Sequence, residues 1–216
     1  MKVFVIHYKK LIERKKFMMD QFVKHNITNF TFIEIDRDEI EKSQFQIFNH
    51  NFKNKKAQVA ITLSHLYAYN EILNNCDYAL ILEDDAILCE NFLDKFSHYI
   101  DQLPDNFDML FIGNGGYLNI PSHKILEGKF VYYKSNIVED WAIMGAAKPT
   151  DSYIVSKKCA KKICNFVKDL ENHVSKPIDW WLTDLFQELN LNVYWGEPTL
   201  VTQGTQIGLF SSSHQY

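Results

Sequence analysis

The sequence predicts an α/β fold in which a sheet is flanked by helices, because apolar runs of strand length alternate with amphipathic segments. Residues 3–8 form an apolar run typical of a buried strand. Residues 11–25 space their apolar side chains as a helix with one buried face does. Residues 30–36 are a second apolar run that ends in an acid. Strand, helix and strand in this order open an α/β unit.

The same alternation continues to the end of the chain. Residues 37–56 are polar and show neither the helix period nor the strand period, and we interpret them as a segment that passes over the sheet. Further strands are predicted at residues 78–82, 108–112, 130–138, 151–155 and 193–195. Further helices are predicted at residues 57–74, 90–101, 157–169 and 177–189. The tail after Gly204 is polar, and no internal repeat is present.

Length and composition favour one folded domain. The chain has 216 residues, of which 46% are apolar, and 16 Phe, 11 Tyr and 4 Trp supply a large core. This composition excludes disordered, collagen-like and low-complexity classes. With 8 Gly and 5 Pro, long flexible linkers are also excluded.

The charge argues against a nucleic-acid partner. The formal net charge is -4, and Arg14 and Arg37 are the only arginines of the sequence. Arginine supplies the planar fork that recognises phosphate, so its scarcity counts against a phosphate-rich macromolecule. An AT-rich genome would also explain it, and both interpretations stay open.

Cysteine spacing and hydropathy predict a cytoplasmic protein with reduced thiols. Four cysteines contain no C-x-x-C pair, so neither a zinc site nor a disulfide framework is indicated. We see no signal peptide and no apolar stretch of the roughly 18 residues that a membrane span needs. Peripheral contact with a membrane stays open.

Three consecutive acids, Glu83, Asp84 and Asp85, directly follow the apolar run 78–82. Adjacent carboxylates repel one another and are costly near a core without a compensating cation. In α/β sheets the carboxyl ends of the strands are where ligands bind. Alternate residues of an extended segment share a face, so Glu83 and Asp85 are expected to point together. Their oxygens suit Mg²⁺ or Mn²⁺. A solvated turn is the alternative.

The wider context of these acids resembles glycosyltransferase family 25, which includes lipopolysaccharide and collagen hydroxylysine galactosyltransferases. The resemblance rests first on the pair Ser64-His65 and on Ala-Leu-Ile-Leu-Glu-Asp-Asp-Ala at residues 79–86. Residues 3–8, Arg14, residues 177–179, Glu197-Pro198 and Gln203 extend it in order from about residue 2 to residue 208.

The resemblance implies a GT-A fold with a single Rossmann-like, nucleotide-binding sheet flanked by helices. It implies one domain over residues 1–216, with a donor-binding half at about 1–115 and an acceptor-binding half at about 116–216. The expected enzyme is a metal-dependent, inverting glycosyltransferase that moves a hexose, galactose or glucose, from a UDP-sugar. The acceptor would be a hydroxyl of a glycan or of a lipid-linked or protein-linked group.

The resemblance also assigns the metal site. Asp85 would bind Mn²⁺ or Mg²⁺ directly, Glu83 would be a second or water-mediated contact, and Asp84 would accept a hydrogen bond from the ribose. A further metal ligand is expected late in the chain, at Gln203 or His214. A cation between the acids and the donor would offset the charge of the leaving diphosphate.

Asp179 is the predicted catalytic base for the acceptor hydroxyl, because Pro177 fixes it in the first turn of a helix. Asp151 is the reserve base, and the alternative for it is an ordinary strand start. Trp180 and Trp181 would stack on a sugar. Interaction with the helix dipole is the alternative for Asp179, and core packing is the alternative for the tryptophans.

The donor pocket is predicted from residues at strand ends and turns. These candidates for binding the nucleotide sugar are His7, Tyr8, Arg14, Ser64, His65, Glu83, Asp84 and Asn114. A solvated charge for Arg14, a core imidazole for His65 and plain turn chemistry at residues 113–116 are the alternatives.

Two other functions remain open at this point. A nucleotidyltransferase would use the same acids and metal, but the sequence lacks a Gly-rich basic phosphate loop near its start. A non-catalytic module that binds a nucleotide sugar would need the acids only for structure.

Overall fold

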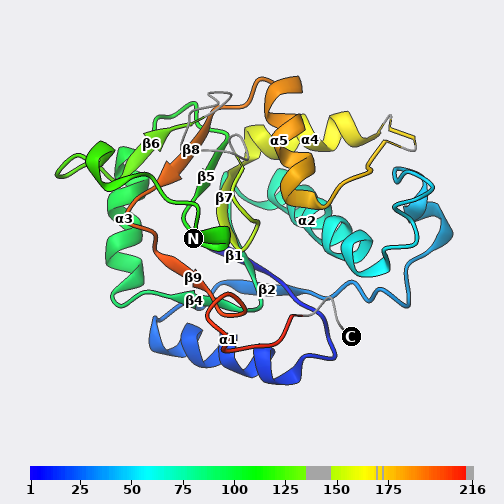
Figure 1. Ribbon diagram of the computed structural model, residues 1–216, viewed down its shortest axis with the longest axis horizontal. Helices are drawn as coiled ribbons and strands as arrows, with labels where there is room; N and C mark the ends of the chain where they lie inside the picture. Colours follow the sequence, from blue (N-terminus) through cyan, green and yellow to red (C-terminus); the bar gives the residue numbers. More distant parts are fainter. Residues whose placement is uncertain (135–146, 169, 172, 213–216) are drawn as a thin grey trace.

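The computed structural model describes residues 1–134, 147–168, 170–171 and 173–212, and a mixed seven-stranded sheet runs through its centre (Figure 1). The strand order is β2-β1-β3-β7-β5-β8-β6. The strands are β1 (Lys2–Ile6), β2 (Phe30–Ile33), β3 (Tyr78–Glu83), β5 (Met109–Phe111), β6 (Val131–Tyr133), β7 (Ser152–Ser156) and β8 (Val193–Gly196). β1 runs parallel to both β2 and β3, whereas β7 lies antiparallel between β3 and β5.

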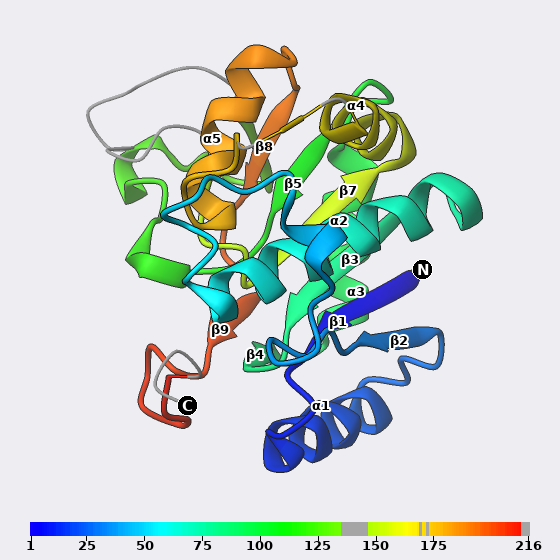
Figure 2. The same ribbon diagram turned by 90° about the vertical axis from the view of Figure 1, so that its right-hand side faces the viewer.

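Helices cover both faces of this sheet, as Figures 1 and 2 show. One face carries α2 (Lys56–Asn75), α4 (Lys157–Lys168) and α5 (Ile178–Glu188), and the other carries α1 (Ile12–Lys24) and α3 (Phe92–Gln102). Side chains of β3 alternate between the two resulting cores: Ile81 belongs to the first and Leu80 to the second. The α/β fold predicted from the sequence is confirmed.

A small second sheet joins the end of the chain to the acidic segment. It pairs β4 (Ala86–Leu88) with β9 (Val201–Gln203) in antiparallel register, with Ala86 opposite Gln203. The residues after β9 therefore lie beside the turn that follows β3. Neither strand was predicted from the sequence, because each is short and forms by pairing with a distant segment of the chain.

Several predicted boundaries need correction. The strands predicted at residues 3–8 and 30–36 end at Ile6 and Ile33, so His7 and Tyr8 lie in a loop. Residues 37–56 contain a 3₁₀ helix, Lys42–Phe45, and also bury two aromatic rings, those of Phe48 and Phe52. The strand predicted at residues 130–138 is limited to β6 as far as residue 134, and its remainder lies outside the described residues.

The structure also describes the state of the cysteines and the length of the helices. All four cysteines are free in the structure. Within the described ranges, none of the helices is long and apolar enough to pass through a bilayer.

Candidate active site

A pocket of about 330 Å³ lies where β1 and β3 end, between α2, the start of α5 and the segment that follows β9. β1 and β3 are parallel neighbours with Ile6 opposite Glu83, so the loops that follow them meet at one edge of the sheet. The predicted site residues that line the pocket are His7, Tyr8, Arg14, Ser64, Glu83, Asp84, Asp85, Asp179 and Gln203.

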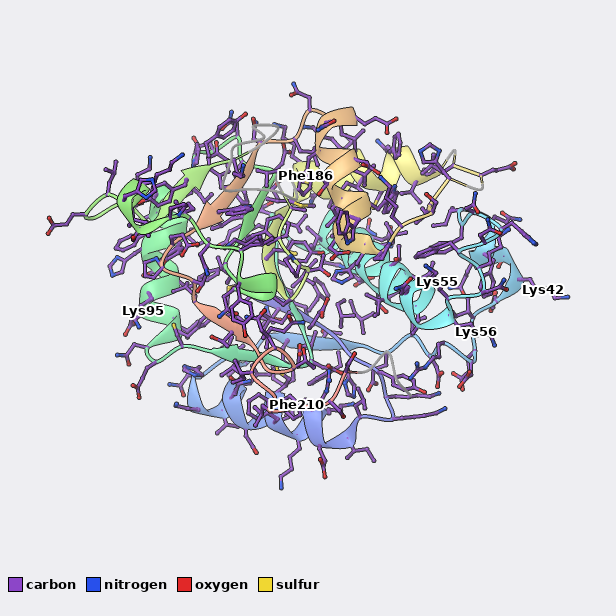
Figure 3. All side chains as sticks on the ribbon, in the orientation of Figure 1. Lys42, Lys55, Lys56, Lys95, Phe186 and Phe210 are labelled. Carbon is purple, nitrogen blue, oxygen red and sulfur yellow. The ribbon has the colours of Figure 1, made fainter. Side chains whose placement is uncertain are left out.

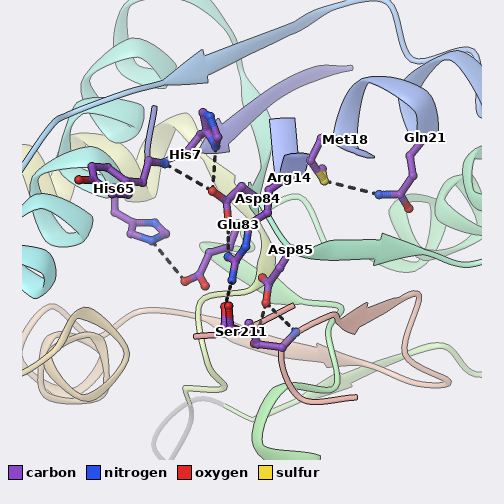
Figure 4. A network of polar contacts seen from close by, with 11 residues as sticks. His7, Arg14, Met18, Gln21, His65, Glu83, Asp84, Asp85 and Ser211 are labelled. Carbon is purple, nitrogen blue, oxygen red and sulfur yellow. Dashed lines mark hydrogen bonds and ion pairs between the residues drawn. The ribbon is translucent and has the colours of Figure 1, made fainter. Parts of the chain in front are cut away.

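Glu83 is an acid whose ionised form is disfavoured. Its Oε1 accepts a hydrogen bond from Thr150 Oγ1 at 2.8 Å and lies 3.9 Å from His65 Nε2. Figure 4 shows His65 beside this carboxylate. Burial, and then the negative charge of Asp85, raise the pKa of Glu83 to about 8. Since 26% of its side chain remains accessible, a cation entering the pocket could reach it and favour the carboxylate.

Asp85 presents two carboxylate oxygens with different surroundings. Its Oδ2 accepts hydrogen bonds from Thr205 N at 3.0 Å and from Thr205 Oγ1 at 2.7 Å. Its Oδ1 is buried and has no hydrogen-bond partner among the described residues. Asp85 as a whole is only 2% exposed. A buried carboxylate oxygen without a partner is costly, and a divalent cation would satisfy it.

The acids of the pocket suit a cation that takes some of its ligands from the protein and the others from phosphate oxygens and water. In the part of the chain that the structure describes, no three His, Cys, Asp or Glu side chains form a closed metal cage. Asp85 and Glu83 both line the pocket. Mg²⁺ and similar ions are commonly held by one or two carboxylates, with phosphate oxygens and water completing the shell. Two acids beside an open pocket meet that requirement.

Asp84, the predicted ribose contact, lines the pocket and is also bound by side chains of the protein. Its Oδ1 accepts a hydrogen bond from Arg14 Nη1 at 2.6 Å, and its Oδ2 accepts one from His7 Nδ1 at 2.8 Å. The Tyr8 backbone N–H is a third donor, at 3.4 Å from Oδ2. Both oxygens are thus occupied by the protein. Asp84 ties the end of β1 and the start of α1 to β3.

Arg14 is a buried bridge rather than the solvated charge considered as an alternative. It is 6% exposed, and besides Asp84 it contacts the end of the chain. Its Nη2 donates to the Ser211 carbonyl at 2.6 Å, and its guanidinium lies 5.2 Å from the Phe210 ring centroid. Figure 3 shows Phe210 over α1. Tyr8 has its own cationic neighbour, because the Arg37 guanidinium lies 4.2 Å from its ring centroid.

His65 lies behind Glu83 and does not line the pocket. Its Nδ1 shares a hydrogen bond of 2.7 Å with Tyr153 OH, which shares another of 2.7 Å with Tyr69 OH. Burial lowers the pKa of His65 to about 3, so the imidazole is neutral at pH 7. Ser64 donates to the Ala60 carbonyl of its own helix at 2.8 Å.

This neutral imidazole makes the stability of the fold depend on pH. A histidine in the unfolded chain has a pKa of about 6.5. Between that pH and about 3, the unfolded state therefore binds a proton that the folded state does not bind. His65 alone therefore lowers the free energy of unfolding as the pH falls below about 6.5, by at most about 1.4 kcal/mol per pH unit. Between about pH 6.5 and 5, we expect wild type to lose stability relative to His65→Phe as the pH is lowered, and urea unfolding of the two proteins measures this difference.

The control is His123→Phe, which changes an exposed histidine and should keep a constant stability difference from wild type over the same pH range. The raised pKa values of Glu83 and Asp151 act in the opposite direction, because both favour the folded state as the pH falls, and both groups are present in all three proteins. Equal slopes for His65→Phe and wild type would contradict the assignment.

Asn114 and Asp151 stand outside the pocket wall. Asn114 Oδ1 accepts a hydrogen bond from Gln203 N at 3.2 Å, so Asn114 supports β9. Asp151 is fully buried, and a Cβ at Gly113 or Gly115 would collide with its carboxylate. Burial raises the pKa of Asp151 to about 7. The reserve assignment of Asp151 as base therefore needs correction, because an acceptor in the pocket cannot touch it.

Asp179 reaches the pocket from the first turn of α5. It is half-buried, and its Oδ1 accepts a hydrogen bond from the Trp180 backbone N–H at 2.9 Å. Trp180 is 50% exposed and lines the pocket, whereas Trp181 is 3% exposed and belongs to the core. Core packing is thus the correct interpretation for Trp181. His214 lies outside the described residues.

Two threonines that contact the acids were missed in the sequence. Thr150 bonds Glu83 across 67 positions of the chain, and Thr205 bonds Asp85 across 120. Neither belongs to a recognisable motif, and no signal in a single sequence would have found them.

The chain matches one known family in sequence and resembles several solved structures. The model of a family described as "Glycosyltransferase family 25 (LPS biosynthesis protein)" matches residues 1–181. No curated protein matches the chain. A glycosyltransferase involved in the glycosylation of the major capsid of PBCV-1 is 12% identical, with a TM-score of 0.53 over 99% of this chain and 95% of that chain.

Two further solved structures are similar to a lesser degree. TarS of S. aureus is 13% identical, with a TM-score of 0.49 over 95% of this chain and 61% of that chain. An active-site mutant of LgtC is also 13% identical, with a TM-score of 0.49 over 90% of this chain and 72% of that chain. At these identities the likenesses concern the fold alone.

Proposed function

Since this chain belongs to glycosyltransferase family 25, we propose that it transfers a hexose from a UDP-sugar to a hydroxyl acceptor with the help of a divalent cation at Asp85. The resemblance that the sequence indicated is confirmed by the family match, and the chain is a glycosyltransferase with a GT-A fold. Galactose and glucose are the proposed sugars.

The observation that carries the cation site is that Asp85 lines the pocket beside Glu83 while its buried Oδ1 has no hydrogen-bond partner among the described residues. Asp85 would hold Mn²⁺ or Mg²⁺ directly, and Glu83 would be its second contact. When bound, the cation would neutralise charge on the two phosphates and stabilise the leaving UDP.

The charges of the pocket support such a cation. The pocket holds Arg14 and Arg37, but Arg14 is already paired with Asp84. A diphosphate placed beside Asp85 would meet like charge, and it would meet a second one whenever Glu83 is ionised. A cation between the acids and the diphosphate would relieve this repulsion and favour the ionised form of Glu83.

Asp179 is the proposed base on the acceptor side of the pocket. Its carboxylate would take the proton of the acceptor hydroxyl while the acceptor oxygen forms a bond to the anomeric carbon. The bond from that carbon to the UDP oxygen breaks on the opposite face, so the configuration is inverted. Trp180, exposed beside Asp179, offers an indole face on which the acceptor sugar can stack.

The pocket also supports the proposed division of labour along the chain. The three consecutive acids 83–85 come from the segment before residue 115, whereas Asp179 and Trp180 come from the later segment. We therefore propose that the earlier half binds the donor and that the later half binds the acceptor. The acceptor class remains a glycan hydroxyl or a lipid-linked or protein-linked hydroxyl.

A test of this function incubates the protein with UDP-galactose or UDP-glucose, with and without Mn²⁺. Release of UDP that depends on the cation is the expected result. Release of pyrophosphate would indicate nucleotidyl transfer instead. Tight binding of the donor with no turnover, even with acceptors supplied, would indicate a non-catalytic module.

Replacing the proposed base should separate donor binding from transfer. We expect Asp179→Asn to bind UDP-hexose as wild type does and to lose transfer by about 10²–10⁴-fold, the usual contribution of a general base. Asp184→Asn is the matched control, because Asp184 lies on the same helix in an exposed ion pair with Lys176. Transfer at wild-type rates in Asp179→Asn would place the base elsewhere.

A further inference from the structure

Within the described part of the chain, the Asp85 side chain accepts hydrogen bonds through one of its two carboxylate oxygens. Both hydrogen bonds that it accepts from Thr205 end on Oδ2, one from the backbone N–H and one from the hydroxyl. The other oxygen, Oδ1, has no hydrogen-bond partner among the described residues, although it is buried. Two donors on one oxygen fix the plane of the carboxylate and leave the second oxygen for a ligand.

The chain places Thr205 there by several backbone contacts. Gly204 N donates to the Asp85 carbonyl at 2.7 Å, directly beyond the pairing of β9 with β4. A Cβ at Gly204 would lie 2.8 Å from that carbonyl oxygen and 2.9 Å from the Phe210 ring, so a side chain would push the two segments apart. Leu209 N then closes a turn by donating to the Gly204 carbonyl at 2.9 Å. Thr205 is thus anchored to the same turn as the acid that it contacts.

The neighbouring acid shows what this arrangement achieves. Asp84 has a protein donor on each of its two oxygens. Asp85 differs because, among the described residues, the donors to its carboxylate come from Thr205 and both bind Oδ2. Figure 4 shows the contrast in its dashed lines, which join Asp84 to His7 and Arg14 and join Asp85 to neither of them.

We infer that Thr205 is a positioning residue for the cation site: its hydroxyl and backbone N–H hold Asp85 so that Oδ1 alone faces the divalent cation. This inference rests on the proposed function, because it takes Asp85 as the cation's ligand. Partners that orient a metal ligand commonly change metal affinity by about 10–100-fold when they are removed. The hydroxyl is one of two donors, so we expect the lower end of that range.

The test measures Mn²⁺ affinity directly. Free Mn²⁺ is followed by electron paramagnetic resonance during titration of the protein in saturating UDP. Thr205→Val and Thr205→Ala remove the hydroxyl and keep the N–H, and Thr205→Ser keeps both. Thr202→Val is the matched control, because Thr202 lies on the adjoining strand β9 without a hydrogen bond to Asp85 among the contacts of the described residues. Melting temperatures without metal are recorded for all variants.

We expect wild type, Thr205→Ser and Thr202→Val to bind Mn²⁺ within about twofold of one another, and both hydroxyl-free variants to bind about tenfold more weakly. A purely structural role for Thr205 would lower the melting temperature and leave the Mn²⁺ affinity unchanged, and this result would overturn the inference. Equal loss in Thr205→Ser would also overturn it. Failure of the wild-type protein to bind Mn²⁺ would overturn the proposed cation site itself, together with the inference built on it.

Discussion

Asp85→Asn should lose about 10³-fold or more in turnover while the fold stays intact. A bound divalent cation contributes several kcal/mol to stabilising a leaving diphosphate, and each 1.36 kcal/mol is about tenfold in rate. The amide oxygen of asparagine can still accept the two hydrogen bonds that Thr205 donates, so the local structure has no reason to change. Turnover of UDP-hexose and the urea midpoint of unfolding are the two measurements.

The effect on stability has a predicted sign as well. The charge of Asp85 is the second largest cause of the raised pKa of Glu83, after burial. Removing that charge relieves repulsion, so Asp85→Asn should unfold at an equal or slightly higher urea concentration than wild type. Asp94→Asn, at an acid in the first turn of α3, is the control for both readouts. Wild-type turnover in Asp85→Asn would contradict the cation site.

Asp84→Ala should differ from Asp85→Asn, because its main effect is a loss of stability. The change leaves the Arg14 guanidinium without its carboxylate partner at a site where both side chains are 7% exposed. Breaking a buried ion pair by removing one partner costs about 3–5 kcal/mol, because the remaining charge is buried without compensation. His7 Nδ1 loses its acceptor in the same variant. Urea unfolding measures this loss as a shift of the midpoint.

A double variant separates a structural from a catalytic role for this pair. Arg14→Met combined with Asp84→Leu removes both charges, and apolar replacement of a whole buried pair is often close to neutral. We expect the double variant to recover a large part of the stability that Asp84→Ala loses. Full stability of the single variant Asp84→Ala would contradict the ion pair.

Much of the fold and the place of the site could be predicted because they depend on local pattern. Alternating apolar runs identified the long strands and helices, and the parallel pairing of β1 with β3 brings the residues after Ile6 beside Glu83. The acids were predicted at the edge of the sheet where they lie. The strands β4 and β9 were missed, since they form by pairing with each other across a long stretch of chain, which no local pattern reveals.

The partners of the site residues could not be predicted, because they come from distant parts of the chain. Arg14 reaches Asp84 across 70 positions, and Thr205 reaches Asp85 across 120. A single sequence also does not reveal which of two adjacent tryptophans faces the pocket: Trp180 does, and Trp181 lies in the core. Whether a side chain faces the pocket or lies in the core depends on packing between elements, and the spacing of residues within one element does not reveal it.

The central claim, that Asp85 holds a cation against the donor diphosphate, is tested most directly by anomalous X-ray scattering. Crystals of the protein soaked with Mn²⁺ and UDP should show an anomalous peak at about 2.1 Å from Asp85 Oδ1, the usual spacing of a small divalent cation and an oxygen ligand. Density for UDP phosphates should reach the same peak. UDP bound in the pocket without an anomalous peak at Asp85, or with the peak elsewhere, would contradict the account.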